Sequence, residues 1–103
     1  MVEVPEITSK HQWYAQLNAA KLMIEKLRGG HYYWTVVSVI EGRLDQMAAV
    51  ARSGRAPSSC DRERGMGLAV IALRSLYRVA PGDCSLLLQL VNGFDHWTSL
   101  PDA

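Results

Sequence analysis

The sequence predicts an all-α protein, a single-domain bundle of four main helices at about 9–28, 31–53, 59–79 and 82–92. Three observations predict it. Apolar residues recur at steps of three and four over most of the chain, which is the period of an amphipathic helix. Short stretches of glycine, proline and serine separate these segments at intervals of one helix length. A chain of 103 residues can bury one core without disulfides or metals.

The first helix has the most regular period in the chain. Residues 1–8 are expected to form a short extended lead-in, and Ser9 has capping-box spacing with Gln12. Gly29 and Gly30 then supply the C-cap and a tight turn. Lys21 and Glu25 are spaced to pair. The expected core face is made of Trp13, Leu17, Ala20, Ile24 and Leu27.

The second helix carries the widest apolar stripe and is therefore expected to pack centrally against several neighbours. A strand over 32–40 is the alternative, because this segment is rich in aromatic and β-branched residues. The helix is favoured because its period continues to Ala51 and no partner strand lies nearby. Gly42 indicates close packing against another helix. The stripe consists of Tyr33, Val36, Val37, Ile40, Leu44, Met47 and Ala51.

The third helix is expected to begin at a capping box, Ser58-x-x-Asp61. Its predicted core face is Met66, Val70, Leu73 and Tyr77, widened by Ala69, Ala72 and Leu76.

The third helix is expected to be separated from the fourth by a break at residues 80–83. Either Pro81 lies in the first turn of the fourth helix or Asp83 is its cap. The fourth helix is apolar on almost all sides and should be buried. Residues 93–103 are expected to form a tail in which Phe94 and Trp97 pack back onto the bundle and the last four residues, 100–103, are loose.

Charge and composition argue against several classes of partner. The formal net charge is +1 and charged residues make up 20% of the chain, without a basic stripe, which argues against nucleic acid. No apolar run approaches the ~20 residues of a membrane span, and no signal peptide is present, so a cytoplasmic protein is expected. Cys60 and Cys84 are expected to be reduced, with a disulfide between them as the less favoured alternative.

No motif for catalysis, cofactor binding or metal binding is found. The histidines His11, His31 and His96 lack ligand-spaced partners. The short glycine motif at 65–67 lacks the preceding strand and the spacing of a nucleotide loop, so small residues for close helix packing are expected there. We therefore expect no enzyme, no cofactor and no metal. An enzyme using Glu41, Asp45 and a histidine is the least favoured class.

Four residues of the second helix are candidates for binding a partner protein: Tyr32, Trp34, Glu41 and Asp45. The two carboxylates are four residues apart on its polar side, so they can form an acidic patch for a basic partner. The simpler interpretation is a solvated helix face with a neighbouring arginine. Tyr32 and Trp34 lie beside the core period, and exposed aromatic residues are favoured interface anchors. The simpler interpretation of the aromatics is burial in the core.

The order of segments resembles the small all-helical immunity proteins of type VI secretion systems. The resemblance covers roughly residues 13–92 and rests on order and spacing. In the second segment it rests on Tyr33, Ser38, Leu44 and Met47. In the third it rests on the run 67–70, Gly-Leu-Ala-Val. Ala80-Pro81 departs from the Asp-Pro of that group.

This resemblance implies a protein that binds and inhibits a cognate toxin, by occluding its nucleotide-binding active site. The group includes proteins that counter NAD(P)-degrading toxins and, more distantly, one that counters a (p)ppApp-synthesising toxin; the sequence does not choose between them. An acidic face at Glu41 and Asp45 would suit a basic phosphate-binding cleft. The alternative is a non-enzymatic helical adaptor, a chaperone-like protein or a homodimer that pairs through an exposed apolar surface.

Overall fold

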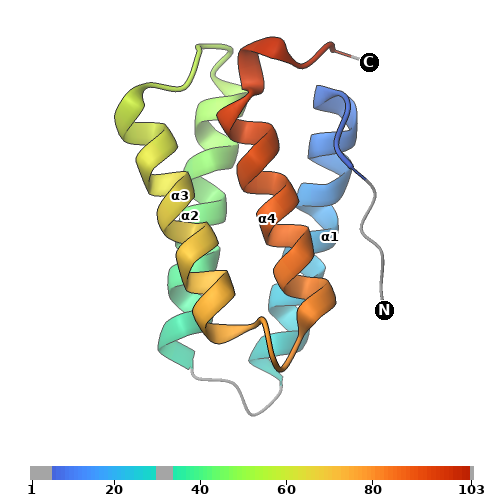
Figure 1. The fold of residues 1–103 in the computed structure, drawn as a ribbon, viewed down its shortest axis with the longest axis vertical. Coiled ribbons are helices and arrows are strands. Elements are labelled where there is room, and N and C mark those ends of the chain that lie inside the picture. Colours follow the sequence, from blue (N-terminus) through green and yellow to red (C-terminus); the bar gives the residue numbers. More distant parts are fainter. Residues whose placement is uncertain (1–5, 30–33, 103) are drawn as a thin grey trace.

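The computed structural model describes residues 6–29 and 34–102, and within them the fold is a four-helix bundle without strands. The helices run alternately up and down (Figure 1), with α3 and α4 in front of α2 and α1. The all-α prediction is confirmed. The helices are α1 (Lys10–Arg28), α2 (Trp34–Arg52), α3 (Ser59–Ser75) and α4 (Pro81–Asp95), followed by the short 3-10 helix η1 (Trp97–Ser99).

Each helix packs mainly against its two neighbours in a closed ring, α1 on α2, α2 on α3, α3 on α4 and α4 on α1. The expectation that the second helix lies at the centre is therefore wrong. A wide apolar stripe is needed by any helix that touches two neighbours, so the width of the stripe does not mark a central helix. The bundle measures 37 × 28 × 19 Å.

The predicted core face of α1 is confirmed in full, since Trp13, Leu17, Ala20, Ile24 and Leu27 are all buried. The prediction of a helix is also confirmed for α2 from Trp34 onward. Residues 31–33, the start of the predicted helix, lie outside the described part of the chain, and so does Tyr33 of the predicted apolar face. Gly42 was expected to pack closely, but nothing approaches within 4 Å of a Cβ placed there. The buried residues of the predicted α2 face are Val37, Ile40, Leu44, Met47 and Ala51.

The predicted core face of α3 is partly wrong. Its four central residues, Met66, Val70, Leu73 and Tyr77, are exposed. The three residues predicted to widen it, Ala69, Ala72 and Leu76, are buried as predicted, together with Gly65 and Leu68. Small residues bring the helix axes close together, and a Cβ on Gly65 would lie 3.5 Å from Phe94 and 3.6 Å from the Met47 sulfur. The close approach expected for the glycines is thus real at Gly65. Leu68 also points inward, whereas Met66, Val70 and Leu73 point outward.

Helix ends differ from the expectation near proline and near the C-terminus. α3 ends at Ser75 instead of residue 79, and Pro81 is the first residue of α4. A residue before proline is disfavoured in helical conformation, which agrees with the non-helical φ of −146° and ψ of 68° at Ala80. α4 continues through Asn92 and Gly93 to Asp95 because its last turn is buried against α1. Gly93 lies against Trp13.

The C-terminal segment is not a loose tail. Phe94 and Trp97 are buried, as predicted, and Trp13 lies between them with ring centroids 6.3 and 5.0 Å away. Beyond η1 the chain returns to the start of α1. There the backbone N–H groups of Lys10 and His11 donate to the carbonyls of residues 101 and 102, at 2.8 and 3.2 Å. The tail satisfies donors that the first turn of a helix otherwise leaves free.

Candidate functional site

The residues predicted to bind a partner lie at the start and middle of α2. Tyr32 lies outside the described residues, and Trp34 is the first residue of α2, with a side chain outside the described part. Glu41 is half-buried and Asp45 is exposed, and both face α1. The structure therefore places two of the four predicted side chains, and both lie at the α1–α2 boundary.

Both carboxylates of this face are paired with cations from α1. Arg28 donates to Glu41 Oε1, and Lys21 Nζ lies 3.4 Å from Asp45 Oδ1. Lys21 thus pairs across the bundle instead of with Glu25 along its own helix. The pairs are solvent-exposed and contribute little to stability. The two acids are therefore part of a mixed-charge face and not an isolated acidic patch.

Catalytic groups do not gather around these carboxylates in the described part of the chain. His11 is exposed at the start of α1, and the His96 ring nitrogen Nδ1 lies 3.0 Å from the Asn92 carbonyl at the end of α4. His31 lies outside the described residues. Glu41 and Asp45 line neither the pocket between α2 and α3 nor the pocket at the start of α1. Among residues 6–29 and 34–102, no group of three His, Cys, Asp or Glu is placed to hold a metal ion.

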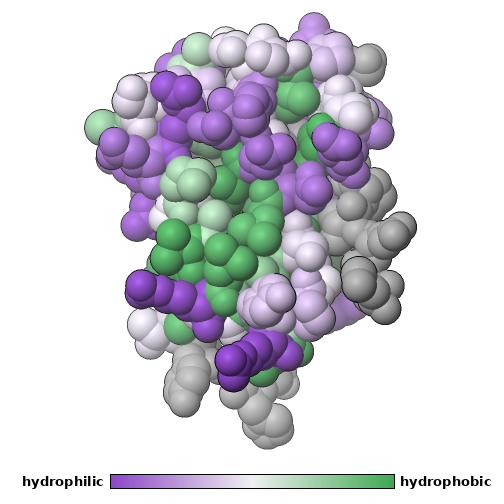
Figure 2. All heavy atoms as spheres, viewed as in Figure 1, coloured by the Kyte–Doolittle hydropathy of each residue, from purple (hydrophilic) through white to green (hydrophobic). Residues whose placement is uncertain are grey.

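The most prominent surface feature is a set of residues that the sequence pattern assigned to the core. The outer face of α3 exposes Met66, Val70 and Leu73, and the turn that follows α3 exposes Tyr77, with 54, 45, 48 and 63% of their surfaces accessible. We call these four residues the α3 stripe. Figure 2 shows an apolar patch over α3, bordered by hydrophilic residues. Contiguous apolar patches of this kind mark interaction sites more often than isolated surface hydrophobics do.

The spacing of the α3 stripe is that of a helix–helix seam. Steps of four, three and four residues place the side chains in one row, the repeat that helices use to pair with another helix. From Met66 to Leu73 the row is about 10 Å long at 1.5 Å per residue, and Tyr77 extends it into the turn after α3. Charges border it unevenly: Glu63 precedes it, and Arg74 and Arg78 lie at its other end. The seam spacing is the signal that could have identified this face from the sequence.

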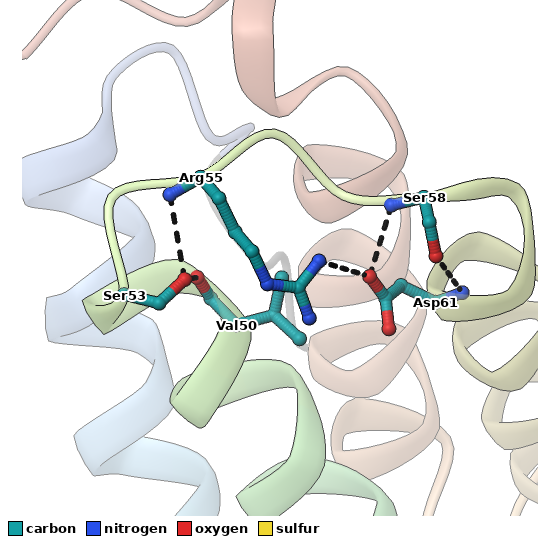
Figure 3. A network of polar contacts seen from close by, with 5 residues as sticks. All are labelled: Val50, Ser53, Arg55, Ser58 and Asp61. Carbon is teal, nitrogen blue, oxygen red and sulfur yellow. Dashed lines mark hydrogen bonds and ion pairs between the residues drawn. The ribbon is translucent and has the colours of Figure 1, made fainter.

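A polar network fixes the end of α3 at which the stripe begins (Figure 3). The Asp61 carboxylate accepts hydrogen bonds from the Ser58 backbone N–H and from Arg55, both at 2.9 Å, and Ser58 Oγ accepts from the Asp61 N–H at 3.2 Å. The predicted capping box is confirmed. The backbone hydrogen bond from Ser58, then the Arg55 guanidinium, lower the pKa of Asp61 to about 2. Asp61 therefore stays charged at neutral pH and fixes the first turn of α3.

The two cysteines are free thiols in different environments. Cys60 is exposed in the first turn of α3, and Cys84 is buried in α4. Burial raises the pKa of the Cys84 thiol. A buried thiol with a raised pKa is a poor nucleophile, which leaves Cys84 as a packing residue.

Comparison with family models, with curated proteins and with solved structures finds no match. The resemblance to immunity proteins therefore stays a prediction from order and spacing. In the described ranges, none of the helices has the length and apolar character needed to cross a membrane.

Proposed function

We propose that this chain is a cytoplasmic immunity protein that binds and inhibits a cognate antibacterial toxin through the α3 stripe. The observation that carries the protein-binding part is the exposed apolar row on α3. Its four residues have between 45 and 63% of their surfaces accessible although the rest of α3 contributes to the core. The resemblance to type VI immunity proteins supports the toxin as the partner.

The composition of the stripe suits a protein interface. Aromatic residues and methionine are enriched in the buried centres of interfaces, and Tyr77 and Met66 stand at the two ends of the row. Met66 adapts to irregular partner surfaces, because its side chain is unbranched and flexible. Burying a side chain such as Leu73 contributes about 1.5–3 kcal/mol. Leu73 lies inside the row, where water is most easily excluded, and is the best candidate for an energetic hot spot.

The border charges indicate the chemistry of the partner. Arg74 and Arg78 are exposed beside the C-terminal half of the row. A complementary surface is an apolar groove edged by carboxylates near that end. A basic phosphate-binding cleft would be repelled there. Direct occlusion of such a cleft instead requires Glu41 and Asp45 at the α1–α2 boundary, together with Tyr32 and Trp34.

A second candidate function is supported by the same row: self-association as a homodimer. If two copies pack their α3 stripes antiparallel, Val70 lies opposite Leu73 of the other copy and Glu63 lies near the other chain's Arg78. Opposite charges then meet at both ends of the seam. This arrangement is self-complementary, as a two-fold interface requires.

The experiment compares two leucines with similar exposure on different helices. Leu73→Glu places a charge in the α3 stripe, and Leu22→Glu places it on α1, where Leu22 is 61% exposed. The wild-type chain and each variant are co-expressed with the product of the upstream gene in the native operon. Growth and cellular NAD and ATP are followed. Circular dichroism verifies that both variants are folded.

We expect the wild-type chain and Leu22→Glu to rescue growth, and we expect Leu73→Glu to fail to do so. If Leu73→Glu still rescues growth and Glu41→Gln or Asp45→Asn does not, the toxin-binding interface lies on α2 instead. If the upstream product is harmless, or kills despite the wild-type chain, the immunity proposal is wrong for that product. Light scattering then decides on self-association, since a dimer that Leu73→Glu alone converts to monomer identifies the stripe as a dimer seam.

A further inference from the structure

A small pocket lies between the C-terminal half of α2 and the first turns of α3. Its volume is about 170 Å³, and three arginines line it: Arg43 from α2, Arg55 from the connecting segment and Arg64 from α3. Figure 3 shows part of this wall, with Arg55 directed at Asp61. The pocket is separate from the α3 stripe and has no role in the function proposed above.

The pocket is strongly positive for a nearly neutral protein. Three guanidiniums and the single carboxylate of Asp61 give its lining a formal charge of +2, against +1 for the entire chain. Asp61 is already engaged by Arg55 and Ser58. Within the described residues, Arg43 and Arg64 have no carboxylate partner. The positive charges of Arg43 and Arg64 therefore repel each other at this pocket, and no carboxylate among the described residues pairs with either.

Contacts with other residues position two of these arginines. Arg43 is half-buried and crosses from α2 toward α3, where its Cζ lies 3.9 Å from the position of a Cβ on Gly67. Arg55 is oriented by its 2.9 Å bond to Asp61. Met47 and Phe94 contribute an apolar floor. An apolar floor limits solvation from below, which strengthens charge interactions at the pocket.

We infer that this pocket binds the phosphoryl group of a phosphate or phosphomonoester. Guanidinium groups present paired N–H donors that match the oxygens of phosphate. A phosphoryl group carries about −1.5 to −2 at neutral pH, which matches the charge of the lining. Ligand pockets that enclose a whole organic molecule are typically about 300–1,000 Å³. At about 170 Å³ the pocket has room for a phosphoryl group, and the rest of a larger ligand would lie outside.

Gln46 adds a neutral donor to the same wall. Its side-chain amide can donate to a phosphoryl oxygen without adding charge. It also supplies a local reporter, because the NMR resonances of a side-chain amide are expected to shift when an anion binds beside it.

The test uses the full chain, with inorganic phosphate and adenosine monophosphate as separate probes. Binding is measured by isothermal titration calorimetry and by the Gln46 amide resonances, against chloride at equal ionic strength. The variants are Arg43→Gln and Arg64→Gln. Arg74→Gln is the control, since it removes the same charge from α3 outside the pocket. Circular dichroism establishes that each variant is folded.

We expect saturable binding of phosphate, weakened about tenfold or more by either pocket variant and unchanged in the control, because hydrogen bonds to charged groups are the strong ones. Tighter binding of adenosine monophosphate than of phosphate would identify a phosphomonoester as the ligand. Equal binding would identify free phosphate. The inference is overturned if phosphate acts no differently from chloride, or if Arg74→Gln weakens binding as much as Arg43→Gln does.

Discussion

Replacing Gly93 by alanine should destabilise the bundle, although alanine is the better helix former. A Cβ at this position would lie 2.8 Å from Trp13 Cδ1 and 3.5 Å from Trp13 Nε1. Carbon atoms attract best at about 3.5–4.0 Å, so the methyl group is at least about 0.7 Å too close. Either Trp13 or the α4 backbone must move.

Trp13 has little freedom to move. It is fully buried, and its Nε1–H donates to the Leu90 carbonyl at 2.9 Å. Its indole also contacts the rings of Tyr14, Phe94 and Trp97. Overpacking a core of this kind costs about 1–3 kcal/mol, and the gain in helix propensity returns about 1 kcal/mol. The difference is about 0–2 kcal/mol, and we expect a net loss near its middle, about 1 kcal/mol, which corresponds to roughly 4–8 °C in Tm.

Gly42→Ala is the matched control, because it makes the same chemical change inside α2. Nothing lies within 4 Å of a Cβ there, and Gly42 is exposed. This variant should gain about 1 kcal/mol of stability from helix propensity alone. Both variants are compared with wild type by urea unfolding, followed by far-UV circular dichroism. The reasoning is refuted if Gly93→Ala is as stable as wild type, or if Gly42→Ala is less stable.

Two further predictions concern charged groups. Because the pKa of Asp61 is lowered to about 2 from an ordinary 3.8, its charge stabilises the fold above about pH 4, and this contribution is lost as the pH falls toward 2. The difference in urea midpoint between wild type and Asp61→Asn should therefore become smaller as the pH falls from about 4 toward 2. A difference that stays constant over this pH range contradicts the prediction. Asp45→Ala should change the unfolding free energy by less than about 1 kcal/mol, because its pair with Lys21 is exposed. A larger loss of unfolding free energy, measured by urea unfolding, would mean that the ion pair between Asp45 and Lys21 contributes substantially to stability.

The sequence predicts the buried face correctly for some helices of this bundle and incorrectly for others. The faces of α1 and α2 were predictable because their large apolar residues are also their buried ones, as Trp13 and Leu44 illustrate. In α3 the two properties separate. Gly65, Ala69 and Ala72 face inward because α3 lies close to its neighbours, and the larger Met66 and Leu73 face outward. Hydrophobicity alone therefore selects the wrong face.

The partners of Glu41 and Asp45 depend on the register of two helices, which no single segment encodes. A short connection makes α1 and α2 antiparallel, so residues at equal distances from the turn are expected to be neighbours. The observed pairs are Arg28 with Glu41 and Lys21 with Asp45. Counting outward from residues 29–33 places Lys21 opposite Glu41 instead, so equal spacing from the turn does not predict these pairs. The three arginines of the pocket come from two helices and their connection, and no spacing rule relates them.

The position of Trp13 also limits the order in which the chain can fold during synthesis. Its hydrogen-bond acceptor is the carbonyl of Leu90, and the rings that cover it are those of Phe94 and Trp97. The first turn of α1 is completed by the carbonyls of residues 101 and 102. Domains generally fold as units as they leave the ribosome. Here the first helix keeps its largest side chain uncovered until the last helix has been made, so the nascent chain has no early, self-sufficient half.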